Sequence, residues 1–199
     1  MASLGDACHE RGDIVDAIRI YIEATNVWRI VYYEDSSSGL DYAHSLHNLG
    51  VLYRKQGELD KAMGAYQNSL HLRLSILGAF HVDVAQTYHN IGIVHCEKGN
   101  LDEAMKSYAK ALKVREELLG STSADFSNTL HNIGVVIKQK GDTEEARKAF
   151  MEALWVAKVL DIEPPCADSL RERCAELFGR DCLDYVSGTF SVSLILSMQ

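Results

Sequence analysis

A histidine followed by an asparagine occurs three times in the chain, each time within the tetrad HN[LI]G. The tetrads occupy residues 47–50, 89–92 and 131–134. Imidazole nitrogens are metal ligands, and a side-chain amide can both donate hydrogen bonds to a peptide backbone and accept them from it. These residue types therefore suggest two possible functions, metal binding and peptide binding.

The tetrads lie in three longer segments that align without a gap, at residues 41–78, 83–120 and 125–162. Both offsets are 42 residues. A similarity that keeps its register over two periods indicates a structural repeat, and periods of this size are typical of solenoids.

Each segment is predicted to form two helices. In 41–78 one apolar stripe with helical spacing runs from Leu46 to Tyr53, and a second runs from Leu59 to Leu70. Gly57 separates them, and glycine suits the left-handed residue that ends a helix. The same separation recurs at Gly99 and Gly141.

Small residues also recur inside the expected helices. Gly50 stands in the middle of the first helix, where glycine costs about 1 kcal/mol relative to alanine, so a packing reason is expected. We predict that Gly50 lets the second helix approach closely and that Ala62 receives an aromatic ring from a neighbour. The equivalent residues are Gly92, Gly134, Ala104 and Ala146.

The spacing L-G-x-x-Y followed by A-x-x-x-[FY]-x-x-[AS] resembles the tetratricopeptide repeat. Segment 41–78 matches it fully, with Tyr53 in the first helix and Tyr66 in the second; the later segments carry His95 and Ile137 in place of the first tyrosine. The longer period and the stretch HVDVA before HNIG resemble the kinesin-light-chain subclass, although Val82 replaces its usual proline. The resemblance implies an all-α fold, a TPR-type α-solenoid of antiparallel helix hairpins that forms a right-handed superhelix.

Four repeat units are expected. An upstream copy of the template begins 45 residues before the second unit, and a serine-rich loop at 35–39 accommodates the three extra residues. Its first helix is clipped by the start of the chain, so we expect that helix to be frayed. The predicted units are 1–38, 39–80, 81–122 and 123–162, followed by a capping helix at 163–180 and a poorly ordered tail at 181–199.

The resemblance places the first helix of each unit on the concave wall of the solenoid, where a guest peptide binds. The side chains opposite the core stripe of these helices combine histidine, asparagine, aliphatic and basic residues. The candidate groove residues are His44, His47, Asn48, Val51, Arg54, Lys55, Gln86, His89, Asn90, Ile93, Asn128, His131, Asn132, Val135 and Lys138.

For each of these residue types two interpretations stay open. Asn48, Asn90 and Asn132 either hold the backbone of an extended peptide or bond within the helix or between neighbouring helices. The three histidines either line the groove or are simply solvated. The basic residues either attract an acidic segment or form an ordinary charged surface.

The repeat argues against a shared metal site. Packed helix axes lie roughly 8–10 Å apart, and a second helix separates successive tetrads. Because ligands must lie about 2 Å from an ion, His47, His89 and His131 cannot bind one metal together. His44 and His47 could chelate weakly, but no third ligand is evident. We therefore predict neither a metal nor another cofactor.

Composition and missing motifs narrow the function further. The net charge of −8 disfavours binding to nucleic acid or to an anionic membrane, and no apolar run is long enough to span a bilayer. The five cysteines form no C-x-x-C pair, and no signal peptide is visible, so we expect the cytoplasm. The chain has no GxxxxGK[ST], GxSxG, HExxH or GxGxxG motif, so we predict that it is not an enzyme.

The sequence thus predicts a protein–protein interaction scaffold that binds a partner protein or an extended peptide in its concave groove. An alternative is a fragment, or a regulatory or cargo-adaptor module, of a larger kinesin-light-chain-like protein. Self-association through the exposed ends of the solenoid is a third hypothesis.

Overall fold

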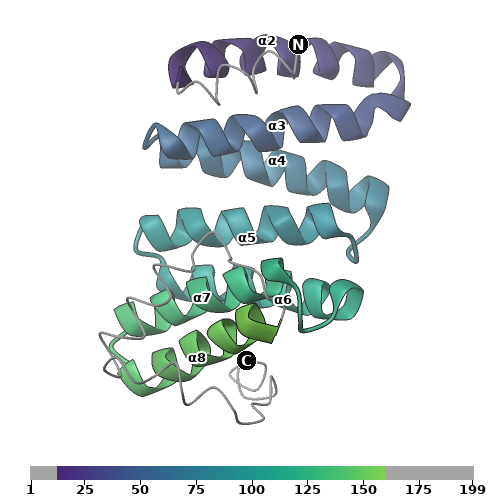
Figure 1. The fold of residues 1–199 in the computed structure, drawn as a ribbon. Helices are drawn as coiled ribbons and strands as arrows, with labels where there is room; N and C mark the ends of the chain where they lie inside the picture. The colour runs from purple at the N-terminus through teal and green to yellow at the C-terminus, as the bar shows by residue number, and fades with distance from the viewer. Residues whose placement is uncertain (1–12, 160–199) are drawn as a thin grey trace. The chain divides into compact units, whose positions relative to one another are not determined.

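The computed structural model describes residues 13–159, and within this range the chain is helical without strands (Figure 1). The all-α prediction is confirmed. A single 3₁₀ turn, Ser36–Ser38, interrupts the series of α-helices. The helices are α2 (Ile14–Glu34), α3 (Gly39–Lys55), α4 (Leu59–Leu77), α5 (Val82–Glu97), α6 (Leu101–Leu119), α7 (Ala124–Gln139) and α8 (Thr143–Val159).

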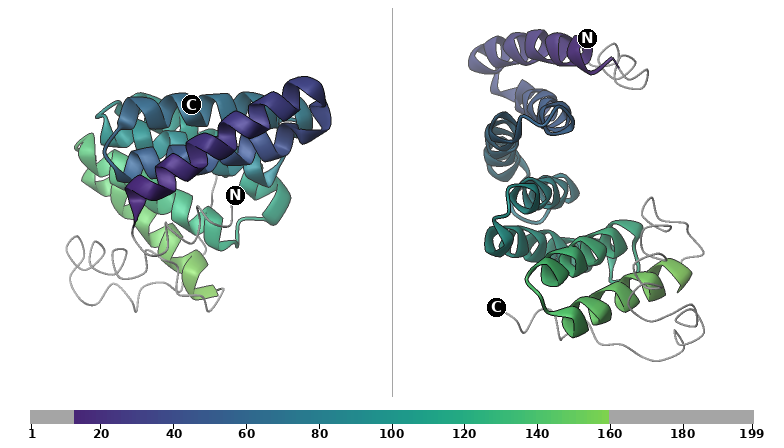
Figure 2. Two further views of the ribbon diagram at one scale, coloured as in Figure 1. Left: turned by 90° about the horizontal axis from the view of Figure 1, so that it is seen from above. Right: turned by 90° about the vertical axis from the view of Figure 1, so that its left-hand side faces the viewer.

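The chain divides into two compact units, Met1–Gly99 and Asn100–Gln199, here called unit 1 and unit 2. In unit 1, α2 packs against α3, α3 against α4, and α4 against α5. Helices α3 and α5 lie on one side of this unit and α4 on the other (Figure 2). In unit 2, α6 packs against α7 and α7 against α8.

Glycine ends the first helix of each hairpin, as predicted. Gly57, Gly99 and Gly141 have φ angles of 84°, 76° and 92°. These values lie in the left-handed region that glycine adopts without a steric penalty. The second helices end in the same way, since Gly78 and Gly120 have φ angles of 79° and 76°.

The glycine inside each first helix faces an aromatic ring of the second helix. A methyl group on Gly50 would lie 2.8 Å from a ring carbon of Tyr66, and one on Gly134 would lie 2.7 Å from a ring carbon of Phe150. Both rings are fully buried. The predicted close approach of the two helices is therefore confirmed in both units.

A second close approach depends on a pair of small residues. The Ser69 hydroxyl on α4 donates to the Ala43 carbonyl on α3 at 2.7 Å. At the equivalent place in unit 2 the two residue types are exchanged, and the Ser127 hydroxyl on α7 donates to the Ala153 carbonyl on α8 at 2.8 Å. All four residues are buried. Alanine and serine thus keep the helices close, and the hydroxyl satisfies its own hydrogen bond from either side.

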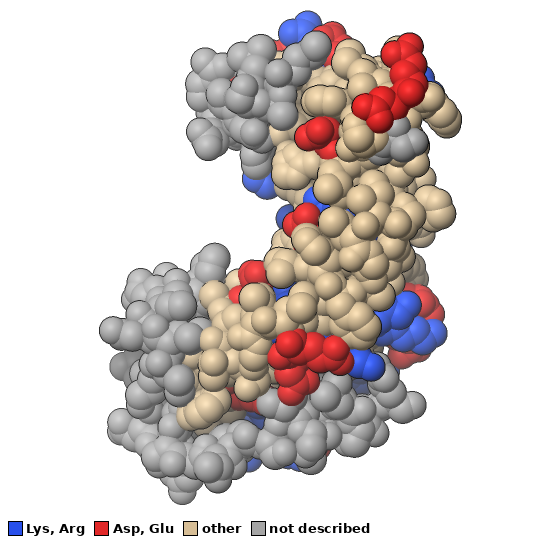
Figure 3. Space-filling model, turned by 90° about the vertical axis from the view of Figure 1, so that its right-hand side faces the viewer, with Lys and Arg blue, Asp and Glu red and all other residues tan. Residues whose placement is uncertain are grey.

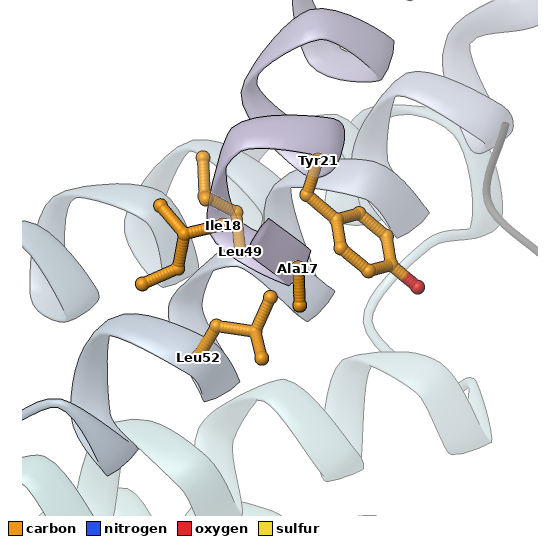
Figure 4. Packing of buried hydrophobic residues seen from close by; sticks show 5 residues of the cluster. All are labelled: Ala17, Ile18, Tyr21, Leu49 and Leu52. Carbon is orange, nitrogen blue, oxygen red and sulfur yellow. The ribbon is translucent and has the colours of Figure 1, made fainter. Parts of the chain in front are cut away.

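An apolar cluster joins α2 to α3 in unit 1 (Figure 4). It consists of Ala17, Ile18 and Tyr21 from α2, and of Leu49 and Leu52 from α3. Burial of these side chains fixes the face that α2 presents to the next hairpin.

Three expectations lie outside the described residues. They are the frayed first helix of the first repeat unit (1–38), the capping helix at 163–180 and the tail at 181–199. The boundaries of the four repeat units remain a prediction.

Candidate functional site

The candidate groove residues lie on α3, α5 and α7, the first helices of the hairpins. Those of α3 and α5 belong to unit 1, where the two helices are neighbours, and those of α7 belong to unit 2. Two of them, His44 and Lys55, are exposed. The half-buried ones are Asn48, Val51, Arg54, Gln86, Ile93, Asn128, Asn132, Val135 and Lys138.

The remaining four candidates are buried. His47, His89 and Asn90 are each 8% exposed, and His131 is 6% exposed. The solvated histidine surface considered from the sequence is therefore wrong. At His47 the cover comes from Tyr66 on α4 and from Asn90 on α5.

His47 is held from both sides within unit 1. Arg73 Nη1 lies 3.3 Å from Nδ1 of the ring, and the Asn90 side-chain amide lies 3.1 Å from Nε2. Because a guanidinium only donates, Nδ1 accepts from Arg73, and the Asn90 atom next to Nε2 is the amide nitrogen Nδ2. Both ring nitrogens thus have a polar neighbour within the fold. No group of three or more potential metal ligands occurs in the described part of the chain.

Arg73 extends this network to the following helix. Its Nη1 donates to the Asp83 carbonyl at 2.9 Å and to the Thr87 hydroxyl at 2.7 Å. In unit 2, Arg115 makes the same contacts with the Asp125 carbonyl and the Thr129 hydroxyl. Burial lowers the pKa of both guanidinium groups.

These two arginines are not among the residues predicted from the sequence, although the sequence carries a signal for them. Arg73 and Arg115 stand 42 residues apart, and so do Thr87 and Thr129. Two polar residue types that repeat together at the period of the fold indicate a contact between successive hairpins.

Two of the asparagines bond between neighbouring helices. Asn48 Nδ2 donates to the Tyr21 hydroxyl on α2 at 2.9 Å, and Asn90 contacts His47 on α3. The interhelical alternative considered from the sequence therefore holds at both positions. Asn48 remains half-buried, so its amide keeps access to a guest that Asn90 has largely lost.

The positive charge of one basic candidate, Arg54, is compensated by an ion pair. Arg54 Nη1 on α3 forms an ion pair with Glu97 Oε1 on α5 at 2.8 Å. Next to it, burial raises the pKa of Tyr66 to about 12, so its phenol stays neutral. A matching pair at the turn between helices, Lys98 with Asp60 at 2.6 Å, recurs in unit 2 as Lys140 with Asp102 at 2.8 Å. Exposed pairs of this kind contribute little to stability.

Because the His47 ring is buried, we predict that the folded protein loses stability in acid. Burial, and then the charges of Arg73 and His44, lower its pKa from 6.5 to about 3. The unfolded chain takes up a proton below pH 6.5 that the folded chain refuses, so stability is complete above this pH and falls as the pH drops toward 3. Between pH 7.5 and 5.5 the loss from this group is roughly 1.4 kcal/mol. Urea unfolding at several pH values measures it.

His47→Gln serves as the test variant, because glutamine keeps an acceptor for Arg73 and does not titrate. The exposed His44, replaced by glutamine, is the control. We expect the slope of stability against pH to flatten only in the His47→Gln protein. An equal slope in that variant and the wild type would contradict the assignment.

No helix in residues 13–159 combines the length and the apolar character needed to cross a membrane.

Three overlapping stretches, residues 1–75, 41–117 and 83–158, match the family model of the tetratricopeptide repeat (TPR). The chain belongs to the TPR family. The predicted TPR-type solenoid is therefore confirmed, and the hairpins of units 1 and 2 are TPR hairpins.

Solved structures with the same fold include proteins of kinesin-light-chain type. BtubC (BKLC) from P. vanneervenii is 20% identical, with 98% of this chain and 78% of that chain covered and a TM-score of 0.78. Kinesin-light-chain TPR-like repeats from Podosopora anserina are 13% identical, with 99% and 93% covered and a TM-score of 0.72.

A third structural neighbour is MamA, 16% identical, with 92% of this chain and 89% of that chain covered and a TM-score of 0.59. At these identities the likeness concerns the fold. No curated protein matches the chain in sequence.

Proposed function

We propose that this TPR protein holds an extended peptide, or an extended segment of a partner protein, against the face formed by its first helices. TPR repeats in general mediate protein–protein interaction. The proposal adds the place and the form of the guest. It includes no catalysis and no cofactor, and it assigns the chain to the cytoplasm.

The composition of the α3 and α5 surface supports this choice. Val51 and Ile93 are half-buried aliphatic residues whose remaining surface is open, and the amides of Asn48 and Gln86 lie on the same helices. Peptide sites combine apolar contact with a few amide groups that bind the main chain. This mixture on neighbouring first helices is the observation that carries the proposal.

Charge gives the guest a further property. The Arg54–Glu97 ion pair compensates one cation of this surface, and a second cation, Lys55, is exposed at the end of α3. A guest with an acidic group near Lys55 gains attraction without displacing the ion pair. In unit 2, Asn128, Asn132, Val135 and Lys138 offer the same residue types on α7.

The test selects peptides from a random library on the full chain and then measures their affinity for variants. His44→Glu and Lys55→Glu change exposed groove positions and leave the buried network intact. We expect selected peptides to lose about ten-fold in affinity. Gln67→Glu and Lys61→Glu, on the opposite side of unit 1 on α4, are the matched controls.

Equal losses in the groove and control variants, or no loss in either, would remove the groove proposal. Asn90 is a poor test position, because its side chain is buried against His47 and a bulky acidic replacement would disturb packing. The exposed positions avoid this ambiguity.

A second candidate is a cargo-adaptor or regulatory module of a larger kinesin-light-chain-like protein. The likeness of the repeats to those of the Podosopora anserina protein favours it. In that case the same surface would bind cargo, so the groove variants test both candidates. Sequence upstream of Met1 separates them, because an adaptor of this type would continue there.

A further inference from the structure

Three tyrosines gather where α2 meets α3 in unit 1. Tyr32 and Tyr33 end α2, and Tyr42 lies in the first turn of α3; the ring centroids of Tyr32 lie 6.0 Å from those of Tyr33 and of Tyr42. The side chains of Tyr32 and of Ile76 on α4 both lie next to Gly39. These three residues are called the tyrosine patch below. Tyr33 is 82% exposed, whereas Tyr32 and Tyr42 are half-buried.

The other repeats show that the fold does not require this patch. The place of Tyr33 is taken by Gly78 after α4 and by Gly120 after α6, and both glycines end their helix with a positive φ. Here the helix continues through Tyr33 to Glu34. A large aromatic side chain thus replaces a helix-ending glycine, and apart from its contact with Tyr32 most of its surface is exposed.

The rim of the patch is acidic. Between residues 29 and 42 the sequence carries Glu34, Asp35 and Asp41 against the single base Arg29. Hydrogen bonds from the Ser37 hydroxyl and amide, at 2.6 and 2.9 Å, lower the pKa of Asp35 and keep it ionised. Figure 3 shows acidic side chains over this end of α2 within a largely uncharged surface.

We propose that the tyrosine patch binds a proline-rich segment of another protein that carries arginine or lysine. Proline rings pack against tyrosine faces, and a polyproline II chain has no internal hydrogen bonds, so its carbonyls accept from phenol hydroxyls. A cationic side chain gains both from the carboxylates of the rim and from the exposed face of Tyr33. This surface is separate from the proposed groove and does not depend on it.

An amphipathic helix or a second copy of the chain would use α2 differently. Val15, Ile22 and Ile30 are exposed along the same helix, and a helical occupant would contact them over its length. A proline-rich segment of about five residues, roughly 16 Å long and centred on Tyr33, would not reach Ile22, which lies roughly 17 Å away along α2. Ile22 therefore distinguishes the occupants.

The experiment measures fluorescence anisotropy of a labelled synthetic peptide with the full 199-residue chain. The probe is a polyproline peptide of about five residues, including an arginine at each end. We expect saturable binding that Tyr33→Ala weakens about five-fold or more, and that Tyr33→Phe largely retains because the ring remains. Asp35→Asn should weaken it by a smaller factor, and a peptide ending in glutamate should not bind.

Phe80→Ala is the matched control, since Phe80 is an exposed aromatic residue, 56% exposed, in the following loop. Neither it nor Lys55→Glu in the proposed groove should change the affinity, so this proposal and the groove proposal fail independently. Circular dichroism confirms folding of the Tyr33→Ala protein, whose lost ring is mostly solvated.

Several results would overturn the proposal. One is the absence of saturable binding up to about 1 mM peptide. Another is equal affinity for a glycine–serine peptide with the same arginines, since charge alone would then explain binding. A loss with Ile22→Ser as large as with Tyr33→Ala would instead assign the surface to a helix or to a second copy.

Discussion

Replacing Gly50 with valine should destabilise unit 1 by about 3 kcal/mol. Even a methyl group at this position would lie 2.8 Å from the Tyr66 ring, which is fully buried and cannot move aside without shifting α4. Valine is a somewhat better helix former than glycine, but that gain is only a few tenths of a kcal/mol. The steric clash therefore outweighs the gain in helix propensity, and the net effect of the substitution is destabilising. Urea unfolding followed by circular dichroism measures the change.

Gly64 supplies the matched control. It lies within α4 of the same unit, and a methyl group there would meet nothing within 4 Å. Gly64→Val should change stability by no more than about 0.5 kcal/mol. Combining Gly50→Val with Tyr66→Ala should cost less than the sum of the two single changes, because the ring that causes the clash is gone. Equal costs at positions 50 and 64 would contradict the packing argument.

The repeat register could be predicted because its determinants are local. Gly57 and its equivalents recur at a fixed distance from the apolar stripes, so the sequence alone indicates where each first helix ends. The glycine at position 50 is costly in a helix, and three copies at one register pointed to a close approach. Tyr66 and Phe150 then occupy the space that these glycines leave.

The candidate site was less predictable because its partners are distant in sequence. Periodicity places His47 next to the core stripe, but it does not say whether another helix covers that face. The answer comes from Arg73, 26 residues later, and from Asn90, 43 residues later. A side chain at the edge of a helical stripe becomes buried or exposed according to such residues, which a single helix cannot reveal.

The same reasoning explains the asparagines. An amide at a surface register suits both a guest peptide and a neighbouring helix, and the residue type does not distinguish them. At Asn48 the Tyr21 hydroxyl of the preceding hairpin takes one of its bonds. Lys55 and His44, which are both exposed, are therefore better markers of the proposed binding surface than the asparagines.

Arg73→Ala should destabilise unit 1 by about 3 kcal/mol. Arg73 is 4% exposed and donates from one nitrogen to groups on two other helices, the His47 ring on α3 and the Thr87 hydroxyl on α5. Truncation removes the packed aliphatic stem and leaves buried acceptors with fewer donors. The truncation also removes the group that connects α3 to α5. Urea unfolding of the full chain measures the loss.

Arg54→Ala is the control for arginine chemistry as such. Arg54 joins α3 to α5 through a partly exposed ion pair with Glu97, and exposed pairs of this kind contribute at most about 1 kcal/mol. Arg73→Met separates the two contributions of the buried residue, because methionine keeps the stem and loses the donors. We expect its cost to lie between those of the two alanine variants. If Arg73→Ala cost no more than Arg54→Ala, the buried arginine would not connect successive hairpins, and its recurrence as Arg115 would need another reason.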